Sequence, residues 1–172
     1  MTQYPQWYLR KLPRVKNARR ANSPKGTAAS ERRRRRYLEH DIQTKFVAVI
    51  RNRVELFPEF EMMYANQGGG ERPAIVERDE RGKVVRRFSP EGKRLKAEGG
   101  RAGIPDLFFA SPQNDFHGLY LETKTPDGSL SKDQKWWFAH LRARGYRCEV
   151  YRSVEQGIEI VCDYFGIQNF PI

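Results

Sequence analysis

The sequence predicts an α/β fold, in which a mixed central sheet is flanked by helices and preceded by a disordered basic N-terminal arm. Short strand-like apolar segments alternate with segments of helical period, in the order helix, strands, helix, strand, helix. The chain has 172 residues, the usual length of one domain, and its 38% hydrophobic content suffices for a single core. We find no internal repeat.

The N-terminal arm, residues 1–36, carries the net charge of the whole chain. It contains 12 Lys and Arg residues against one acid, whereas the remaining residues hold 20 cations and 20 anions. Its prolines and scarce apolar residues predict disorder. Five consecutive cations repel one another and attract a polyanion, so a nucleic-acid partner is favoured over a merely solubilising tail. These cations are Arg32, Arg33, Arg34, Arg35 and Arg36.

The composition also indicates a compartment. No apolar stretch approaches the ~18 residues of a membrane helix, and no apolar segment near the N-terminus resembles a secretion signal. Cys148 and Cys162 are too few for a disulfide scaffold or a zinc site of the CxxC type. We therefore expect a cytoplasmic protein with reduced thiols, no membrane partner and no secretion.

The first predicted helix covers residues 38–57, where apolar residues recur at steps of three and four. Pro58 ends this helix. A short strand follows at 62–65 and runs into a glycine-rich loop at 66–70.

Residues 71–98 are polar and predict an insertion outside the core. Two aliphatic segments within them flank an Asp-Glu-Arg-Gly turn, which indicates a hairpin. Residues 90–98 are also compatible with a helix.

The second half of the chain completes the sheet. Strands are expected at 104–110 and 117–124, followed by a helix over 131–144 that begins with an N-cap serine. A third strand at 146–151 and a helix after residue 153 end the domain. The aromatic residues of the 131–144 helix are expected to pack it onto the sheet.

One group of residues suggests chemistry: Asp106, and 15 residues later Glu122, Thr123 and Lys124. Side chains alternate along a strand, so Glu122 and Lys124 share a face and Thr123 points away. If the two strands pair as a hairpin, Asp106 lies beside Glu122. A carboxylate within an apolar strand is costly unless it is used.

Two adjacent carboxylates repel one another, and a divalent cation removes that repulsion. Mg²⁺ prefers oxygen ligands, here Asp106, Glu122 and the Thr123 carbonyl. A cation held there can bind a phosphodiester and lower the pKa of a water, while Lys124 orients that water or stabilises the transition state. The alternative is an ion pair on an edge strand, since this spacing also arises by chance.

Several motifs together resemble the VRR-NUC branch of the PD-(D/E)xK nucleases. They are Gly-Ile-Pro-Asp-Leu at 103–107, Leu-Glu-Thr-Lys at 121–124, Leu-Ser-Lys-Asp-Gln at 130–134 and Gly-Tyr at 145–146. Glu39, Asn66 with the glycines after it, and the 96–103 lead-in also fit the family. The resemblance covers about residues 37–165, so the N-terminal arm inherits no role from it.

This resemblance implies a restriction-endonuclease-like core. It implies Asp106 and Glu122 as metal ligands with the Thr123 carbonyl, and Lys124 as the catalytic lysine. It implies that Glu39 reaches the metal, through water.

Three further polar residues are candidates for the same site. The resemblance implies that Gln134 positions the lysine or a phosphate. Gln43 lies one helical turn after Glu39 and either braces it or binds phosphate. Arg101, on the flexible turn before Asp106, is a candidate phosphate contact.

We therefore expect a nuclease domain at 37–172 that acts as an Mg²⁺- or Mn²⁺-dependent DNA endonuclease. Compact members of the family resemble Holliday-junction resolvases, which implies branched or duplex DNA cut by a homodimer, of viral or mobile-element type, in a bacterium or infected host cell. The alternatives are a non-catalytic nucleic-acid-binding protein that uses the arm, and a nicking or RNA-directed nuclease of the same fold.

Overall fold

A computed structural model describes residues 27–66 and 75–171. The predictions for the first 26 residues and for the glycine-rich loop after Asn66 lie outside this part of the chain. Within it, no helix is both long and apolar enough to cross a bilayer.

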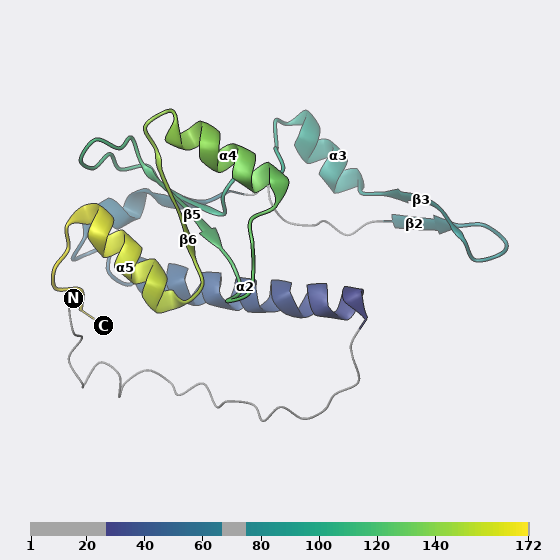
Figure 1. The fold of residues 1–172 in the computed structure, drawn as a ribbon, viewed down its shortest axis with the longest axis horizontal. Coiled ribbons are helices and arrows are strands. Elements are labelled where there is room, and N and C mark those ends of the chain that lie inside the picture. Colours follow the sequence, from purple (N-terminus) through teal and green to yellow (C-terminus); the bar gives the residue numbers. More distant parts are fainter. Residues whose placement is uncertain (1–26, 67–74, 172) are drawn as a thin grey trace, which may run out of the picture. The chain divides into compact units, whose positions relative to one another are not determined.

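A four-stranded mixed sheet forms the centre of the fold (Figure 1), as predicted. Its spatial order is β1-β4-β5-β6, with antiparallel β1–β4 and β4–β5 pairs and a parallel β5–β6 pair. The strands are β1 Met63–Ala65, β4 Leu107–Phe109, β5 Leu119–Thr123 and β6 Arg147–Tyr151. The hairpin between the strands that carry the acidic motif is therefore confirmed.

The helices agree with the expected order. They are α2 Ala28–Arg51, the 3-10 helix η1 Pro58–Met62, α3 Pro90–Ala97, α4 Lys132–Arg142 and α5 Val154–Phe165. Ser131 and Ser153 are the N-caps of α4 and α5, and each hydroxyl accepts a hydrogen bond from a backbone N–H in the first turn.

Helix α2 differs from the prediction at both ends. It begins at Ala28, so the arginine run belongs to a helix and not to an irregular arm. Arginine is a good helix former, and the Thr27 hydroxyl accepts from the Ser30 N–H at the start of the helix. The helix ends at Arg51, six residues before the predicted end at Phe57, and turns lead from there to η1.

Strand β4 is shorter than the predicted 104–110 segment. Pro105 has no N–H to donate to a ladder, and Asp106 comes directly before the first paired residue, Leu107. The catalytic candidate thus lies at the end of a strand and not within it.

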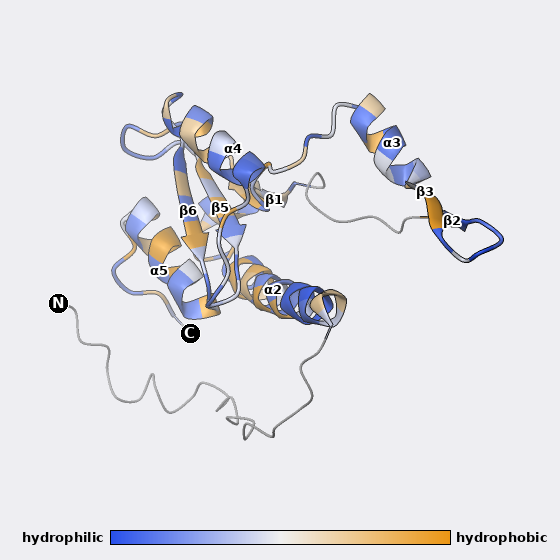
Figure 2. Cartoon of the chain, turned by 45° about the vertical axis from the view of Figure 1, so that its right-hand side comes forward, coloured by the Kyte–Doolittle hydropathy of each residue, from blue (hydrophilic) through white to orange (hydrophobic). Residues whose placement is uncertain are grey.

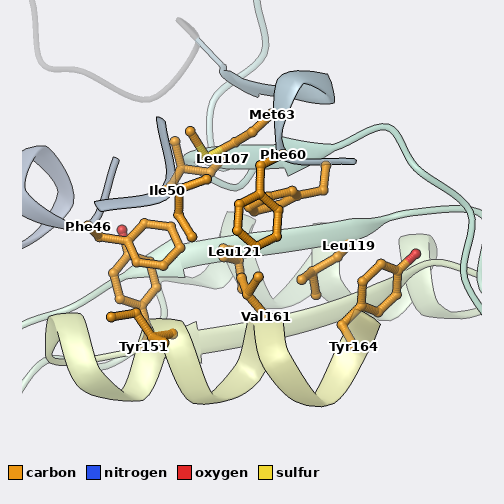
Figure 3. Close-up of a cluster of buried hydrophobic side chains, with 12 residues drawn as sticks. Phe46, Ile50, Phe60, Met63, Leu107, Leu119, Leu121, Tyr151, Val161 and Tyr164 are labelled. Carbon is orange, nitrogen blue, oxygen red and sulfur yellow. The ribbon is translucent and has the colours of Figure 1, made fainter. Parts of the chain in front are cut away.

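Two hydrophobic clusters hold the helices on opposite faces of the sheet. On one face, α2 and α5 bury aromatic and aliphatic side chains against the strands (Figure 3). On the other face, Phe138 and Leu141 of α4 pack against Cys148 of β6. The first cluster includes Phe46, Ile50, Leu107, Leu119, Leu121, Tyr151, Val161 and Tyr164.

The polar insertion contains the predicted hairpin, formed by β2 Ile75–Arg78 and β3 Val84–Phe88. Helix α3 follows, capped by Ser89. The hairpin exposes aliphatic residues, and part of one strand is orange in Figure 2 while the loop is blue; Val85 is 61% exposed. These residues belong to neither hydrophobic cluster.

Candidate active site

The β4–β5 register brings the two acidic residues together. Leu107 pairs with Leu121, and continuing this antiparallel register by one residue places Asp106 opposite Glu122. Both leucines face the core, so both acids lie on the other side of the hairpin. Asp106 Oδ2 accepts a hydrogen bond of 2.9 Å from the Thr123 N–H, which fixes the carboxylate against β5.

Asn66 holds the backbone around Asp106 from the β1 side. Its N–H donates to the Asp106 carbonyl, and its Nδ2 donates to the Pro105 carbonyl, both at 2.8 Å. The sequence pointed to Asn66 only through the family resemblance, because no local pattern reveals a bond between residues 39 positions apart. Asn66 therefore positions the acid without touching its carboxylate.

Glu122 is almost wholly buried, at 1% exposure, and its two oxygens differ. Oε1 accepts from Lys124 Nζ at 2.5 Å and also from Gln134 Nε2. Oε2 is buried and has no hydrogen-bond partner among the described residues. A buried acceptor without a donor is unfavourable, so this oxygen is available to a ligand.

Gln134 connects Glu122 to the start of α4. Its Oε1 accepts from the Ser131 N–H at 2.8 Å, and its backbone N–H donates to Ser131 Oγ, which completes a capping box. With the amide oxygen held in this way, Nε2 is directed at Glu122. Gln134 was predicted to position the lysine or a phosphate; in the structure its side chain contacts the acid.

Lys124 is the central cation of the site. Its Nζ donates to Glu122 and, at 3.1 Å, to the Thr123 carbonyl, and it lies 4.0 Å from Glu39 Oε1. Glu39 Oε1 also accepts from the Thr125 N–H at 3.3 Å, which joins α2 to the end of β5.

The Thr123 side chain points away from this group, as strand alternation predicts. Its hydroxyl donates to Tyr151 Oη at 2.7 Å in the hydrophobic cluster. Only the Thr123 backbone takes part in the site.

The surroundings of Asp106 and Glu122 disfavour ionisation of both carboxyl groups at once. Burial raises the pKa of Glu122 to about 7, and repulsion from Asp106 acts in the same direction, against the opposing effect of Lys124. Burial also raises the pKa of Asp106, although its hydrogen bond from Thr123 and the charge of Lys124 oppose the shift. A single ammonium group does not compensate both carboxylates.

The donor set fits a divalent cation with an incomplete protein shell. Asp106 and Glu122 supply hard oxygen donors, one of them unpartnered, and Mg²⁺ commonly takes only one or two carboxylates beside water and substrate oxygens. The described residues contain no group of three or more His, Cys, Asp or Glu placed to hold a metal. The ligand role of Glu39, like those of the other named residues, therefore stays a prediction.

The other predicted residues lie around this centre. Gln43 is half-buried on α2, and within the described residues its side chain makes no hydrogen bond to Glu39. The arginines 32–36 are exposed on the first turns of α2. Arg101 lies next to α4, with its guanidinium carbon 5.4 Å from the Trp137 ring centre and 5.8 Å from that of Trp136.

One aromatic residue of α4 departs from the prediction. Trp137 packs against the second hydrophobic cluster, but Trp136 is 45% exposed. Successive helical residues are rotated by about 100°, so the residue before Trp137 falls outside the buried face.

Comparisons with known proteins agree with this fold. A family model, the VRR-NUC domain, matches residues 70–155, half of the chain. This segment includes Asp106, Glu122, Lys124 and Gln134, and it begins after Glu39. The match is narrower than the 37–165 range expected from the motifs.

A solved structure described as a VRR_NUC domain protein is also similar. It has a TM-score of 0.54 and 22% sequence identity, and the match covers 78% of this chain and 93% of the other. At this identity the likeness shows the fold. No curated protein gives a significant match. The family match and the shared fold lead to one assignment: the chain belongs to the VRR-NUC domain family, whose fold is of the nuclease type.

Proposed function

We propose that this protein is a metal-dependent DNA endonuclease that hydrolyses phosphodiester bonds at the Asp106–Glu122–Lys124 group. The observation that carries the proposal is the buried, unpartnered Oε2 of Glu122 beside a second carboxylate. Structural ion pairs satisfy their oxygens, whereas this arrangement leaves one acid oxygen for a ligand. The nuclease-type fold of the family supports the same reaction class.

Asp106 and Glu122 would hold the cation, with Mg²⁺ or Mn²⁺ as the candidates. When bound, such an ion polarises a phosphoryl oxygen and lowers the pKa of a water. The hydrogen bond from Thr123 to Asp106 and the one from Gln134 to Glu122 hold the two carboxylates in place before substrate arrives. This preorganisation avoids reorganisation during the reaction.

Lys124 would act on the phosphate or on the attacking water. An ammonium group has three donors, and two of them already serve Glu122 and the Thr123 carbonyl. The third can donate to a non-bridging phosphate oxygen, where charge develops during in-line attack. We expect 5′-phosphate and 3′-hydroxyl ends.

We extend the proposal to the substrate: branched, Holliday-junction-like DNA cut by a homodimer. Two-fold symmetry would present two such sites to opposite strands. The exposed arginines 32–36 of α2 and the basic residues before them would contribute phosphate contacts.

The test is a cleavage assay on linear duplex, single-stranded, nicked and four-way DNA, with Mg²⁺, with Mn²⁺ and with EDTA. The wild-type protein is expected to cut only with the metal and to prefer the four-way substrate. Asp106→Asn, Glu122→Gln and Lys124→Met should each abolish cleavage and retain DNA binding. Cleavage by all three variants at the wild-type rate would refute the proposed site, and binding without any metal-dependent cleavage would indicate a non-catalytic binding protein.

A further inference from the structure

Helix α4 carries an exposed side that the proposed chemistry does not use. Its inner side buries Phe138 and Leu141 against the sheet, and its first turn positions Gln134 on Glu122. The remaining side presents Trp136, a residue that is 45% exposed.

The indole of Trp136 is held in place by its neighbours. The ring of His140, one turn further along, stacks on it with a centroid distance of 3.8 Å and an interplanar angle of 23°. His140 Nδ1 donates to the Trp136 carbonyl at 2.8 Å, which fixes the imidazole in that orientation. A ring that is already ordered loses little entropy when a ligand stacks on it.

Cations flank this aromatic pair. Lys132, Trp136 and His140 follow one another at intervals of four residues in α4. Arg144, in the turn after the helix, donates to the His140 carbonyl at 2.9 Å and extends this row, which we call the α4 ridge. Lys132 and Arg144 are exposed. Arg101 adds a guanidinium group 5.8 Å from the Trp136 ring centre. The ridge thus combines a stacking surface with positive charge at both ends, the pattern that suits single-stranded nucleic acid.

We propose that the α4 ridge binds an unpaired nucleotide of the DNA substrate. This inference rests on the proposed nuclease function and names a feature of its branched substrate: a base that is unpaired or opened at the branch point. The exposed part of the Trp136 indole takes the base, while Arg101, Lys132 and Arg144 face the adjacent phosphates. A paired base is unsuitable because its neighbours in the duplex already cover both of its faces.

The ridge and the catalytic group are reached by different sides of α4. Gln134, whose side chain contacts Glu122, precedes Trp136 by two residues, which is an axial rise of about 3 Å and a rotation of about 200°. A nucleotide on the ridge is therefore bound outside the acidic pair, on DNA that continues beyond the cut bond. Arg101, whose guanidinium group lies beside the Trp136 ring, belongs to the segment that leads to Asp106.

The test measures binding without cleavage, with the full chain in EDTA at constant salt. Two fluorescent probes are compared by anisotropy: an oligo(dT) of about 12 nucleotides and a hairpin duplex with a similar number of phosphates. Trp136→Ala is expected to weaken oligo(dT) binding about tenfold and to change duplex binding by less than about twofold. Trp136→Phe, which keeps an aromatic face, should recover most of the loss. Tyr64→Ala, at a 51% exposed aromatic residue on β1, is the matched control and should leave both affinities unchanged.

A stacking readout completes the test. With 2-aminopurine in the oligonucleotide, the wild-type protein should change the probe fluorescence and Trp136→Ala should not. If Trp136→Ala lowered the affinity for oligo(dT) and for the duplex equally, or lowered neither affinity, the inference would be overturned. Because no metal is present, either result leaves the nuclease proposal standing, whereas absence of metal-dependent cleavage would refute that proposal and leave the binding result unaffected.

Discussion

At the scale of single residues, the environment of Glu122 favours its neutral form when no metal ion is bound, even with Lys124 in contact. Burial is the main cause, and the nearby charge of Asp106 adds to it. Lys124 and Gln134 share one of its oxygens and leave the other unpartnered. The residue is thus unfavourable for stability and suited to binding a cation, as expected of a functional site.

This environment predicts a pH-dependent stability in the absence of metal. The pKa of Glu122 is about 7 in the folded protein against an ordinary value of 4.5, so the folded state keeps a proton that the unfolded state releases. The contribution to the free energy of unfolding is fully present below pH 4.5 and is lost as the pH rises through 7, by roughly 3 kcal/mol. Glu122→Gln should remove this decline. Urea denaturation in EDTA at about pH 5 and about pH 8 measures it, and an equal decline in the two proteins would contradict the account.

Gln134 provides a second prediction at this scale. Its side chain holds Glu122, so Gln134→Ala should lower kcat about 10- to 100-fold and leave KM nearly unchanged. Gln168→Ala, at an exposed glutamine near the C-terminus, is the control. Steady-state kinetics on the best DNA substrate would measure both variants. A change confined to KM would show that Gln134 binds substrate and does not position the acid.

At the scale of elements, the site depends on how the loop before β4 packs on α4. Gly103 has φ +81°, and a Cβ there would lie 2.6 Å from the Asp133 Cβ and 2.7 Å from the Asp133 carbonyl carbon. The loop also accepts a hydrogen bond from Trp137 Nε1 at the Ala102 carbonyl. Close approach at Gly103 thus joins the segment that ends at Asp106 to the helix that carries Gln134.

Gly103→Ala should therefore destabilise the protein more than an alanine substitution at a glycine whose surroundings leave room for a Cβ. Gly99 also has a positive φ, of +92°, but a Cβ there would meet nothing within 4 Å, so Gly99→Ala isolates the backbone strain. We expect Gly103→Ala to lose about 1–3 kcal/mol more stability than Gly99→Ala and to reduce cleavage. Thermal unfolding compares the two. Equal melting temperatures would show that this close approach has no structural importance.

Much of the site was predictable because it depends on local rules. Strand alternation and hairpin pairing predict that Asp106 meets Glu122, and the Ser131 cap follows from its position before a helical segment. The bonds of Gln134 to Glu122 and of Asn66 to Pro105 were not predictable in this way, since they depend on how α4 and β1 pack on the hairpin. The start of α2 was not predictable from the apolar pattern, because the first turns of this helix hold few apolar residues and only the helix propensity of arginine favours them.

At the scale of the whole molecule, the charge distribution predicts which segment would attract DNA. Residues 1–36 carry the entire net charge of +11, and the rest of the chain is balanced. We propose that the two parts have separate roles. The basic segment supplies affinity for DNA, and the domain at 37–172 hydrolyses the phosphodiester bond. A polyanion that binds the basic segment releases counterions, which makes binding salt-dependent.

Replacing Arg32, Arg33, Arg34 and Arg35 by glutamine should therefore weaken binding and flatten its salt dependence. For every phosphate that no longer meets a cation, the slope of log K against log salt decreases by about 0.9. Duplex binding between about 50 and 200 mM salt provides the measurement. Four glutamine substitutions at Lys93, Arg94, Lys96 and Glu98, in and just after α3, lower the net charge by two and serve as a comparison. An unchanged slope in the arginine variant would exclude these side chains from phosphate binding.

Isothermal titration of Mn²⁺ tests whether Asp106 and Glu122 jointly hold a divalent cation beside Lys124. The wild-type protein at a pH just below 7 should bind Mn²⁺ and release protons, because part of the Glu122 population is still protonated there and a cation displaces that proton. The release appears as a heat that varies with the ionisation enthalpy of the buffer. Asp106→Asn and Glu122→Gln should each abolish the binding. Equal Mn²⁺ affinity in the wild type and in both variants, or no binding by the wild type, would contradict the account.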